Sequence, residues 1–277
     1  RNFETGMKPN IDCPCHMIHP PPSGRAVKGP EMDCIIVSAP RSGLNWIRFC
    51  VEKFYGRRTP GKEQLISKKD DPGSAFIRSH DALGYTRVFR RRSGAWRHID
   101  PAATSADTKC ILILRDPLET FVRASKKSLW RFRAYVGNIH FQSRCNGNKF
   151  VIHYDQLITD PAAMKELFDF MAIEPAATSA KPDRELIERK WDEAATESRS
   201  RYDENQAGSG GATTKDNPTD FTFHQRSLSD FERRMIWDFL RRRLSSDEMA
   251  LVQRYEPDSP CRLSFFERVY SVLYMLR

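Results

Sequence analysis

Residues 34–55 constrain the fold of this chain more than any other stretch. They begin with the short apolar run Ile35-Ile36-Val37, which is rich in β-branched residues and does not alternate with polar ones. A run of this kind, followed by Pro and Gly, is typical of a strand buried on both faces. Apolar residues then recur at positions 46, 47, 50, 51 and 54, the spacing of an amphipathic helix. The stretch therefore predicts a strand, a polar loop and a helix.

The polar loop, residues 38–43, is a candidate anion site. The first turn of a helix has backbone N–H groups without partners and a partial positive charge, so it binds anions readily. Arg41 adds a fixed cation with forked donors, Ser42 adds a hydroxyl, and Gly43 lets the backbone approach a ligand. The loop is not a Walker A loop, because G-x-x-x-x-G-K-[ST] is absent. The alternative interpretation is an ordinary strand-to-helix turn with an exposed arginine.

Strands and helices alternate along the rest of the chain. Strands are predicted at 74–80, 109–114 and 150–154, and helices after Pro117, after Asp160-Pro161, over 183–198 and from Ser229, where Ser229 and Glu232 match a capping box. This alternation favours an α/β fold: a single domain with a central, mostly parallel sheet flanked by helices and a P-loop-like anion loop.

Composition suggests the limits of that domain. Six prolines in residues 1–30 predict an extended N-terminal arm, and we assign the domain itself to residues 31–260. Residues 202–220 are rich in Gly, Ser, Asn and Thr, which predicts a loop or a backbone cradle. Residues 261–277 predict a C-terminal amphipathic segment that packs on the domain.

Charge and cysteine content indicate the kind of partner and compartment. The net charge of +9 implies an anionic partner: a nucleotide cofactor, a nucleic acid or a polyanionic substrate. The basic residues are spread along the chain, which favours a small anion over a nucleic acid. No apolar run approaches the ~18 residues of a membrane span. Seven scattered cysteines, an odd number, predict free thiols, so we expect a cytoplasmic protein.

No metal site is expected. The N-terminal arm has four closely spaced potential ligands, but they lack the usual spacing of a zinc site and a second ligand pair. These residues are Cys13, Cys15, His16 and His19.

Three polar residues directly follow predicted strands: Arg41, His80 and Arg115. Because ligands of parallel sheets bind beyond the carboxyl ends of the strands, we expect these side chains to converge.

Four motifs, in order, resemble those of sulfotransferases that use PAPS (3′-phosphoadenosine 5′-phosphosulfate). Residues 38–46, Ser-Ala-Pro-Arg-Ser-Gly-Leu-Asn-Trp, resemble the 5′-phosphosulfate loop of that family. Arg78-Ser79-His80 resembles the segment with the catalytic histidine, and Leu114-Arg115-Asp116-Pro117 the start of the 3′-phosphate motif. Tyr154-Asp155-Gln156-Leu157 with Asp160-Pro161 resembles a fourth motif. As an ordered set, covering residues 34–172, the motifs are specific.

The resemblance implies a role for each site residue. His80 is implied to be the general base, and Arg41 to stabilise charge on the leaving phosphate. The acceptor is implied to be a small molecule with a hydroxyl or amine, the product nucleotide PAP, and no metal is required. The residues implied to bind the nucleotide are Arg41, Ser42, Gly43, Leu44, Asn45, Trp46, Arg115, Arg123, Tyr154 and Thr196. Spacing alone is equally consistent with Trp46 in the core.

The chain also departs from the family pattern. Arg41 stands where the family usually has Lys, and Arg123 stands where a 3′-phosphate serine is usual. Either Arg123 or Ser125 is expected to take over that contact. The C-terminal Arg-Lys-Gly signature of the family is absent. Thr196 is the residue of this chain that corresponds to a family threonine that contacts the adenine.

Two alternatives from other classes remain open. A P-loop-like nucleotide kinase predicts a loop lysine and a Mg²⁺-binding carboxylate, and the loop has no lysine. A basic module that binds nucleic acid or another polyanion through a degenerate nucleotide site is permitted by the basic stretches 87–97 and 241–243, although such runs are more often solvated faces.

Overall fold

The fold is known here from a computed structural model. It describes residues 34–60, 74–86, 97–176, 180–208, 228–257 and 263–276. The predicted N-terminal arm, with its cysteines and histidines, lies outside the described residues, as do most of the predicted 202–220 loop and the basic stretch 87–96.

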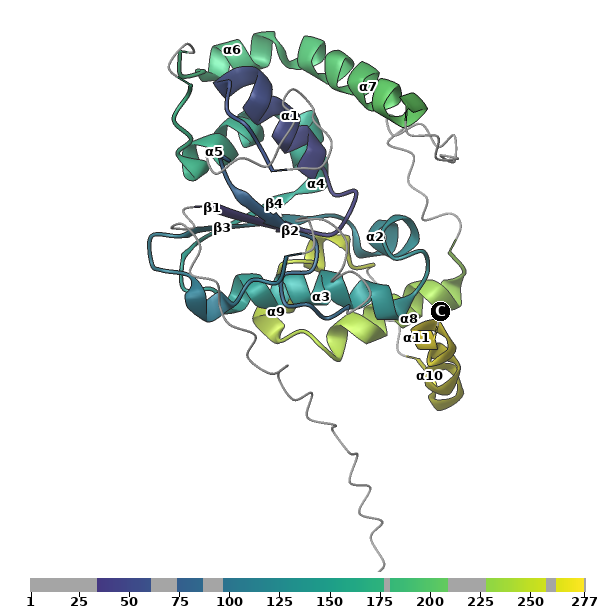
Figure 1. Cartoon of the computed structure of the whole chain (residues 1–277). Helices are drawn as coiled ribbons and strands as arrows, with labels where there is room; N and C mark the ends of the chain where they lie inside the picture. Colours follow the sequence, from purple (N-terminus) through teal and green to yellow (C-terminus); the bar gives the residue numbers. More distant parts are fainter. Residues whose placement is uncertain are drawn as a thin grey trace, which may run out of the picture. The chain divides into compact units, whose positions relative to one another are not determined.

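A four-stranded, all-parallel sheet forms the centre of the domain (Figure 1). Its strands are β1 (Cys34–Ser38), β2 (Ile77–Ser79), β3 (Lys109–Leu114) and β4 (Asn148–His153), in the order β2-β1-β3-β4. Val37 of β1 pairs with Ser79 on one side and Leu112 on the other. The predicted α/β architecture with a parallel sheet is therefore confirmed.

The two central strands are buried on both faces. In β1, Ile35 and Val37 face one apolar core, whereas Cys34 and Ile36 face a second core on the other side of the sheet. All five residues of β1 are buried, which explains why Ile35, Ile36 and Val37 do not alternate with polar residues.

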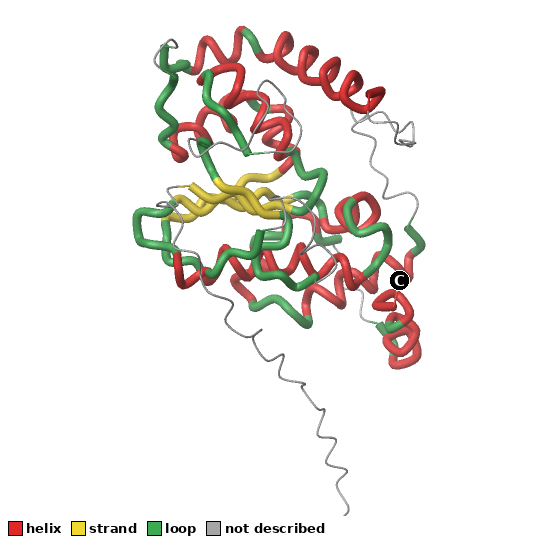
Figure 2. Tube along the Cα trace, in the orientation of Figure 1, coloured by secondary structure: helices red, strands yellow, loops and turns green. Residues whose placement is uncertain are grey.

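Helices cover both faces, so that the sheet lies between two helical layers (Figures 1 and 2). The layer that contains α1 consists of α1 (Leu44–Tyr55), α4 (Tyr154–Thr159), α5 (Pro161–Met171), α6 (Arg184–Arg189) and α7 (Trp191–Gly208). The opposite layer consists of α2 (Pro117–Arg123), α3 (Leu129–Arg144), α8 (Asp230–Arg241), α9 (Ser246–Ala250), α10 (Phe265–Ser271) and α11 (Leu273–Leu276). Two 3₁₀ helices, η2 (Pro101–Ala103) and η4 (Gln253–Tyr255), complete the described elements named here.

The strand order changes direction between β1 and β3. The chain leaves β1 through α1 and adds β2 on one side, then crosses to the other side of β1 to add β3 and β4. In open parallel sheets, a crevice for ligands forms at such a switch point, beyond the carboxyl ends of the strands. The loop after β1 and the residues after β3 therefore border the expected ligand position.

The helix-start signals in the sequence are confirmed by hydrogen bonds. Asp160 caps α5 by accepting from the N–H of Ala162 at 2.8 Å. Ser229 and Glu232 form the expected capping box of α8, whose apolar stripe is buried. Each cap satisfies N–H groups that a helix start leaves without partners.

Four boundaries differ from the prediction. The strand predicted at 74–80 is only Ile77–Ser79. Tyr154, predicted to end a strand, begins α4. The single helix predicted over 183–198 is two helices that meet at Lys190, and the second continues to Gly208 through residues predicted to be a loop. The polar residues 202–207 include good helix formers such as Glu and Gln, whose intrinsic preference outweighs the low hydropathy that suggested a loop.

Candidate anion site at the strand ends

The loop between β1 and α1 has an unusual backbone. Arg41 adopts a left-handed conformation with φ 63°, and Gly43, the N-cap of α1, has φ 87°. Left-handed residues are costly for a side chain such as arginine and are found mainly where a function or the surroundings impose them. The two together reverse the chain sharply, so that it leaves the sheet and enters α1 within five residues.

Only glycine fits at position 43. A Cβ atom added there lies 2.8 Å from Cδ2 of Leu157 and 3.0 Å from Cδ2 of Tyr154, both in α4. The close approach of α4, together with the positive φ, fixes the loop against a second element.

The start of α1 has the features of an anion site. No side chain caps it, and its first turn has no acidic residue. The hydroxyl of Ser42 is fully buried beside it and has no hydrogen-bond partner among the described residues. Because buried polar atoms are nearly always bonded, the Ser42 hydroxyl and the uncapped N–H groups beside it are donors that an anion could use.

Arg115 joins the two central strand ends. Its Nη1 atom donates to the carbonyl oxygen of Arg41 at 2.6 Å, and its Nη2 atom lies 3.6 Å from Oε2 of Glu119. The guanidinium is buried and lies 4.2 Å from the ring centroid of Tyr154. Burial lowers the pKa of Arg115 from its ordinary value, since the charged form is desolvated. The residue thus fixes the loop and places a cation at the switch point.

His80 follows β2, on the opposite side of β1 from Arg115, and contacts the last residue of β1. Its Nδ1 atom is 3.0 Å from the carbonyl oxygen of Ser38, the last residue of β1. A carbonyl can only accept, so Nδ1 is the donor and the neutral ring has its lone pair on Nε2. Burial lowers the pKa of His80 to about 4, with a smaller contribution from the charge of Arg78. The imidazole is therefore neutral at physiological pH and able to accept a proton.

Asn138 of α3 holds the chain around His80. Its Nδ2 donates to the carbonyl of His80 at 3.1 Å, and its Oδ1 accepts from the N–H of Ala82 at 3.1 Å. Sequence analysis did not single out Asn138, although an amide among the apolar residues of a helix is a signal of such a role. It also missed Glu119, for which the spacing of four residues from Arg115 was the available signal.

The remaining predicted residues differ in how close they are to this site. Arg123, in the last turn of α2, is close enough to affect the pKa of Arg115, and Tyr154 contacts Arg115 directly. Leu44 is buried and Asn45 exposed in the first turn of α1.

Trp46 and Thr196 have other described contacts. The indole N–H of Trp46 donates to the carbonyl of Leu157, and its ring packs on Phe49 and Trp191. Thr196 is exposed on α7, and in the described residues no hydrogen bond joins its side chain to the loop.

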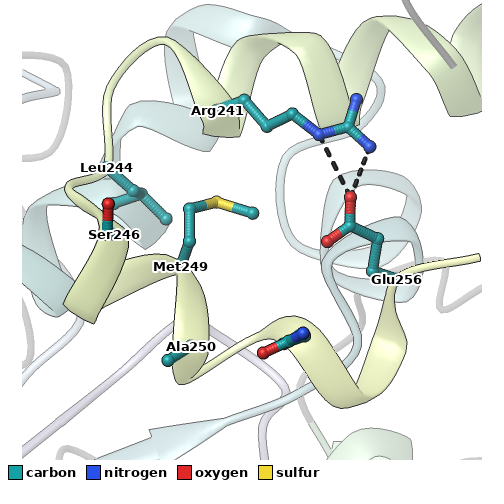
Figure 3. Close-up of a pocket in the computed structure, with 7 residues that line it drawn as sticks. Arg241, Leu244, Ser246, Met249, Ala250 and Glu256 are labelled. Atoms are coloured by element: carbon teal, nitrogen blue, oxygen red, sulfur yellow. Dashed lines mark hydrogen bonds and ion pairs between the residues drawn. The ribbon is translucent and has the colours of Figure 1, made fainter. Parts of the chain in front are cut away.

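A separate pocket lies among the C-terminal helices. It has a volume of about 340 Å³ and is lined by residues of α8, α9, η4 and the segments next to them. Figure 3 shows Arg241 and Glu256 facing each other across it, joined through Nε at 3.1 Å. Because its only ionised groups pair with each other, the pocket has no obvious preference for an anion.

Comparisons with known proteins do not identify the chain: no protein-family model and no curated protein matches it. Among the described residues, no three His, Cys, Asp or Glu side chains come together as a metal site would require. The four described cysteines, Cys34, Cys50, Cys110 and Cys145, are buried and form no disulfide. The described part of the chain contains no helix with the length and apolarity that crossing a bilayer requires.

Proposed function

We propose that this protein is a sulfotransferase that moves a sulfuryl group from PAPS to a hydroxyl or amine of a small-molecule acceptor. The observation that carries the proposal is the hydrogen bond between His80 and Ser38. It fixes a neutral imidazole at the strand end from which the candidate anion loop begins. Arg115, after the neighbouring strand on the other side of β1, holds the same loop through the carbonyl of Arg41.

The residues present fit an anionic nucleotide. Ser42 contributes a buried hydroxyl without a described partner, and the uncapped start of α1 contributes the N–H groups of Gly43, Leu44 and Asn45. These donors would hold the 5′ phosphosulfate in a P-loop-like manner. Of the five N–H donors of Arg115, the hydrogen bond to Arg41 uses one, so others remain for the 3′-phosphate.

Arg123 is the better candidate for the second 3′-phosphate contact, because its charge already influences Arg115. The guanidinium of Arg115 lies over the ring of Tyr154, so we expect the adenine to contact the edge of that ring. Trp46 and Thr196 contribute less to the proposal, because their described contacts are with neighbouring helices or within their own helix.

The chemistry asked of the protein is positioning and charge stabilisation, by analogy with phosphoryl transfer. PAPS, when bound, supplies the sulfuryl group and the phosphate leaving group. His80 accepts the acceptor's proton on Nε2, while its Nδ1–H remains bonded to Ser38. Arg41, exposed at the turn of the loop, stabilises negative charge on the leaving oxygen. No step in this scheme requires a metal.

A metal-free assay with labelled PAPS and a panel of hydroxylated and amine acceptors tests the proposal. Release of PAP coupled to a sulfated product is the expected result. ATP turnover that needs Mg²⁺ would instead favour a nucleotide kinase. Salt-sensitive binding of nucleic acid without turnover would favour a polyanion-binding module.

The matched variants are His80→Asn and His98→Asn. The side-chain amide of asparagine can replace the Nδ1–H donor to Ser38, but it has no atom that replaces Nε2. The His80→Asn variant should therefore retain PAP binding. Its turnover should fall at least 100-fold, the order expected for loss of a general base (~10²–10⁴). His98 is exposed, and its replacement should leave turnover unchanged. Loss of PAP binding in a folded His80→Asn protein would contradict the assigned role.

A further inference from the structure

The hydroxyl of Tyr255 contacts the two residues that flank Tyr154 in the sequence. Its oxygen lies 2.9 Å from Nδ1 of His153, the last residue of β4, and 3.2 Å from Oδ1 of Asp155, in the first turn of α4. Tyr255 ends η4 and is about 100 positions away along the chain. A residue of the C-terminal part therefore holds the junction of β4 and α4 on both sides of Tyr154.

The two hydrogen bonds run in one direction. An ionised carboxylate can only accept, so the hydroxyl of Tyr255 donates to Asp155 and accepts from the Nδ1–H of His153. Burial, with a smaller contribution from the charge of Arg254, lowers the pKa of His153, so its ring is neutral at physiological pH. In this arrangement the hydroxyl uses both its proton and a lone pair, and removing it breaks both bonds at once.

The segment that carries Tyr255 is anchored in the domain. Val252, directly before η4, is fully buried, and the ring of Tyr255 packs against the same apolar core. Arg254 of η4 also pairs with Asp155 at 2.7 Å, but both side chains are more than 40% exposed, and exposed pairs contribute little. The half-buried hydroxyl of Tyr255 is therefore the better-protected link between η4 and the β4–α4 junction.

Tyr154 connects this junction to the candidate anion site. Its ring centroid lies 4.2 Å from the guanidinium carbon of Arg115, and its Cδ2 atom is 3.0 Å from the position of a Cβ atom added to Gly43. The ring thus borders both the buried cation and the start of α1. A small displacement of the junction would move the ring relative to both.

We infer that Tyr255 is a positioning residue: its hydroxyl, through His153 and Asp155, holds Tyr154 against Arg115 and the start of α1. The inference deepens the proposed function and rests on it for the identity of the ligand, an adenine nucleotide with a 3′-phosphate. Tyr255 acts only through Tyr154, so nucleotide binding should depend on it more than the chemical step does.

The variant Tyr255→Phe removes the hydroxyl and keeps the ring. Its affinity for PAP in calorimetry should fall about tenfold, the factor that corresponds to one hydrogen bond of ordinary net strength. The KM for PAPS should rise by a similar factor, while kcat stays within about threefold. Unchanged PAP affinity in a folded Tyr255→Phe protein would overturn the inference.

The matched control is Tyr274→Phe. The hydroxyl of Tyr274, in α11, lies 3.4 Å from Oε1 of Glu232 in α8, so this variant also loses a tyrosine hydroxyl bonded to a carboxylate. Its PAP affinity should stay within about twofold of the original. An equal fall in both variants would reflect a general loss of stability and would contradict a positioning role for Tyr255.

Fluorine NMR of the chain labelled with fluorotyrosine tests the positioning without a nucleotide. The resonance of Tyr154, assigned with Tyr154→Phe, should shift in Tyr255→Phe and stay in place in Tyr274→Phe. If the original chain binds no PAP, the proposed function fails and the fluorine spectra alone decide whether Tyr255 positions Tyr154. A Tyr154 resonance that does not move in Tyr255→Phe would then overturn the inference.

Discussion

The Nη1 atom of Arg115 donates a 2.6 Å hydrogen bond to the carbonyl oxygen of Arg41, so a side chain from the end of β3 holds the loop that follows β1. The left-handed conformation of Arg41 accompanies this contact. The two residues are 74 positions apart in the sequence. They meet because β1 and β3 are adjacent and parallel, which places their carboxyl ends at one edge of the sheet.

Replacing Arg115 by Met should destabilise the protein by about 3–5 kcal/mol, because the buried carboxylate of Glu119 then loses the guanidinium that lies 3.6 Å from it. Urea unfolding measures this loss. Adding Glu119→Leu should recover part of it, as the buried carboxylate is then removed together with the cation. Arg184→Met, at an exposed pair with Glu188, should change stability by less than about 1 kcal/mol. An equal loss in both single variants would contradict a structural role for Arg115.

Gly43→Ala should cost about 2–4 kcal/mol, since the new methyl group meets Leu157 at 2.8 Å and a positive φ disfavours alanine. Binding of PAP, measured by calorimetry, should fall as the loop shifts. Gly56→Ala is the matched control, because Gly56 has φ 62° at the other end of the same helix. It should cost only about 1 kcal/mol and leave nucleotide affinity unchanged.

The free energy of unfolding should depend on pH through His80. Its pKa is about 4 in the folded chain against an ordinary value of 6.5. Between these values the unfolded chain binds a proton that the folded chain does not, so stability should rise with pH across this window and level off above it. The contribution should be at most about 3 kcal/mol.

His80→Asn should remove that rise, as seen in urea titrations at a series of pH values. Asp116, whose pKa burial raises to about 6, contributes a slope of the opposite sign in both proteins. The difference between the two proteins therefore isolates His80. A difference that does not vary between pH ~4 and ~6.5 would show that the imidazole is not desolvated.

Asn138→Ala should lower turnover without abolishing PAP binding, because it removes both bonds that hold the chain around His80. The stability loss should be about 1–3 kcal/mol for the unpaired buried groups. Asn146→Ala is a control at an exposed asparagine, with an expected change below about 1 kcal/mol. Unchanged turnover in Asn138→Ala would show that Asn138 does not position His80.

The sequence was sufficient to predict the sheet, because buried parallel strands need uninterrupted apolar runs, and Ile35-Ile36-Val37 and the run in β3 are such runs. It was less informative for the second part of α7, beyond the helix predicted to residue 198, because the polar residues there have no apolar stripe. The extent of α7 depends on backbone preference and on contacts such as the ion pairs of Lys53 with Glu193 and Glu197.

For the candidate site, the sequence predicted which residues follow strands but not what their side chains contact. The structure places Arg41, His80 and Arg115 at one edge, as expected from their positions after parallel strands. The bond from Asn138 to the His80 carbonyl spans 58 residues, and no local pattern encodes a contact at that distance.

The central position of β1 has a consequence for amide hydrogen exchange. Strand β1 pairs on both edges and is covered by two apolar cores. Its amide protons should therefore exchange with solvent only through global unfolding. The anion loop is the direct continuation of this strand, and Arg115 and His80 attach to it from the two neighbouring strands. Deuterium should therefore enter the loop much more slowly than is usual for a surface turn.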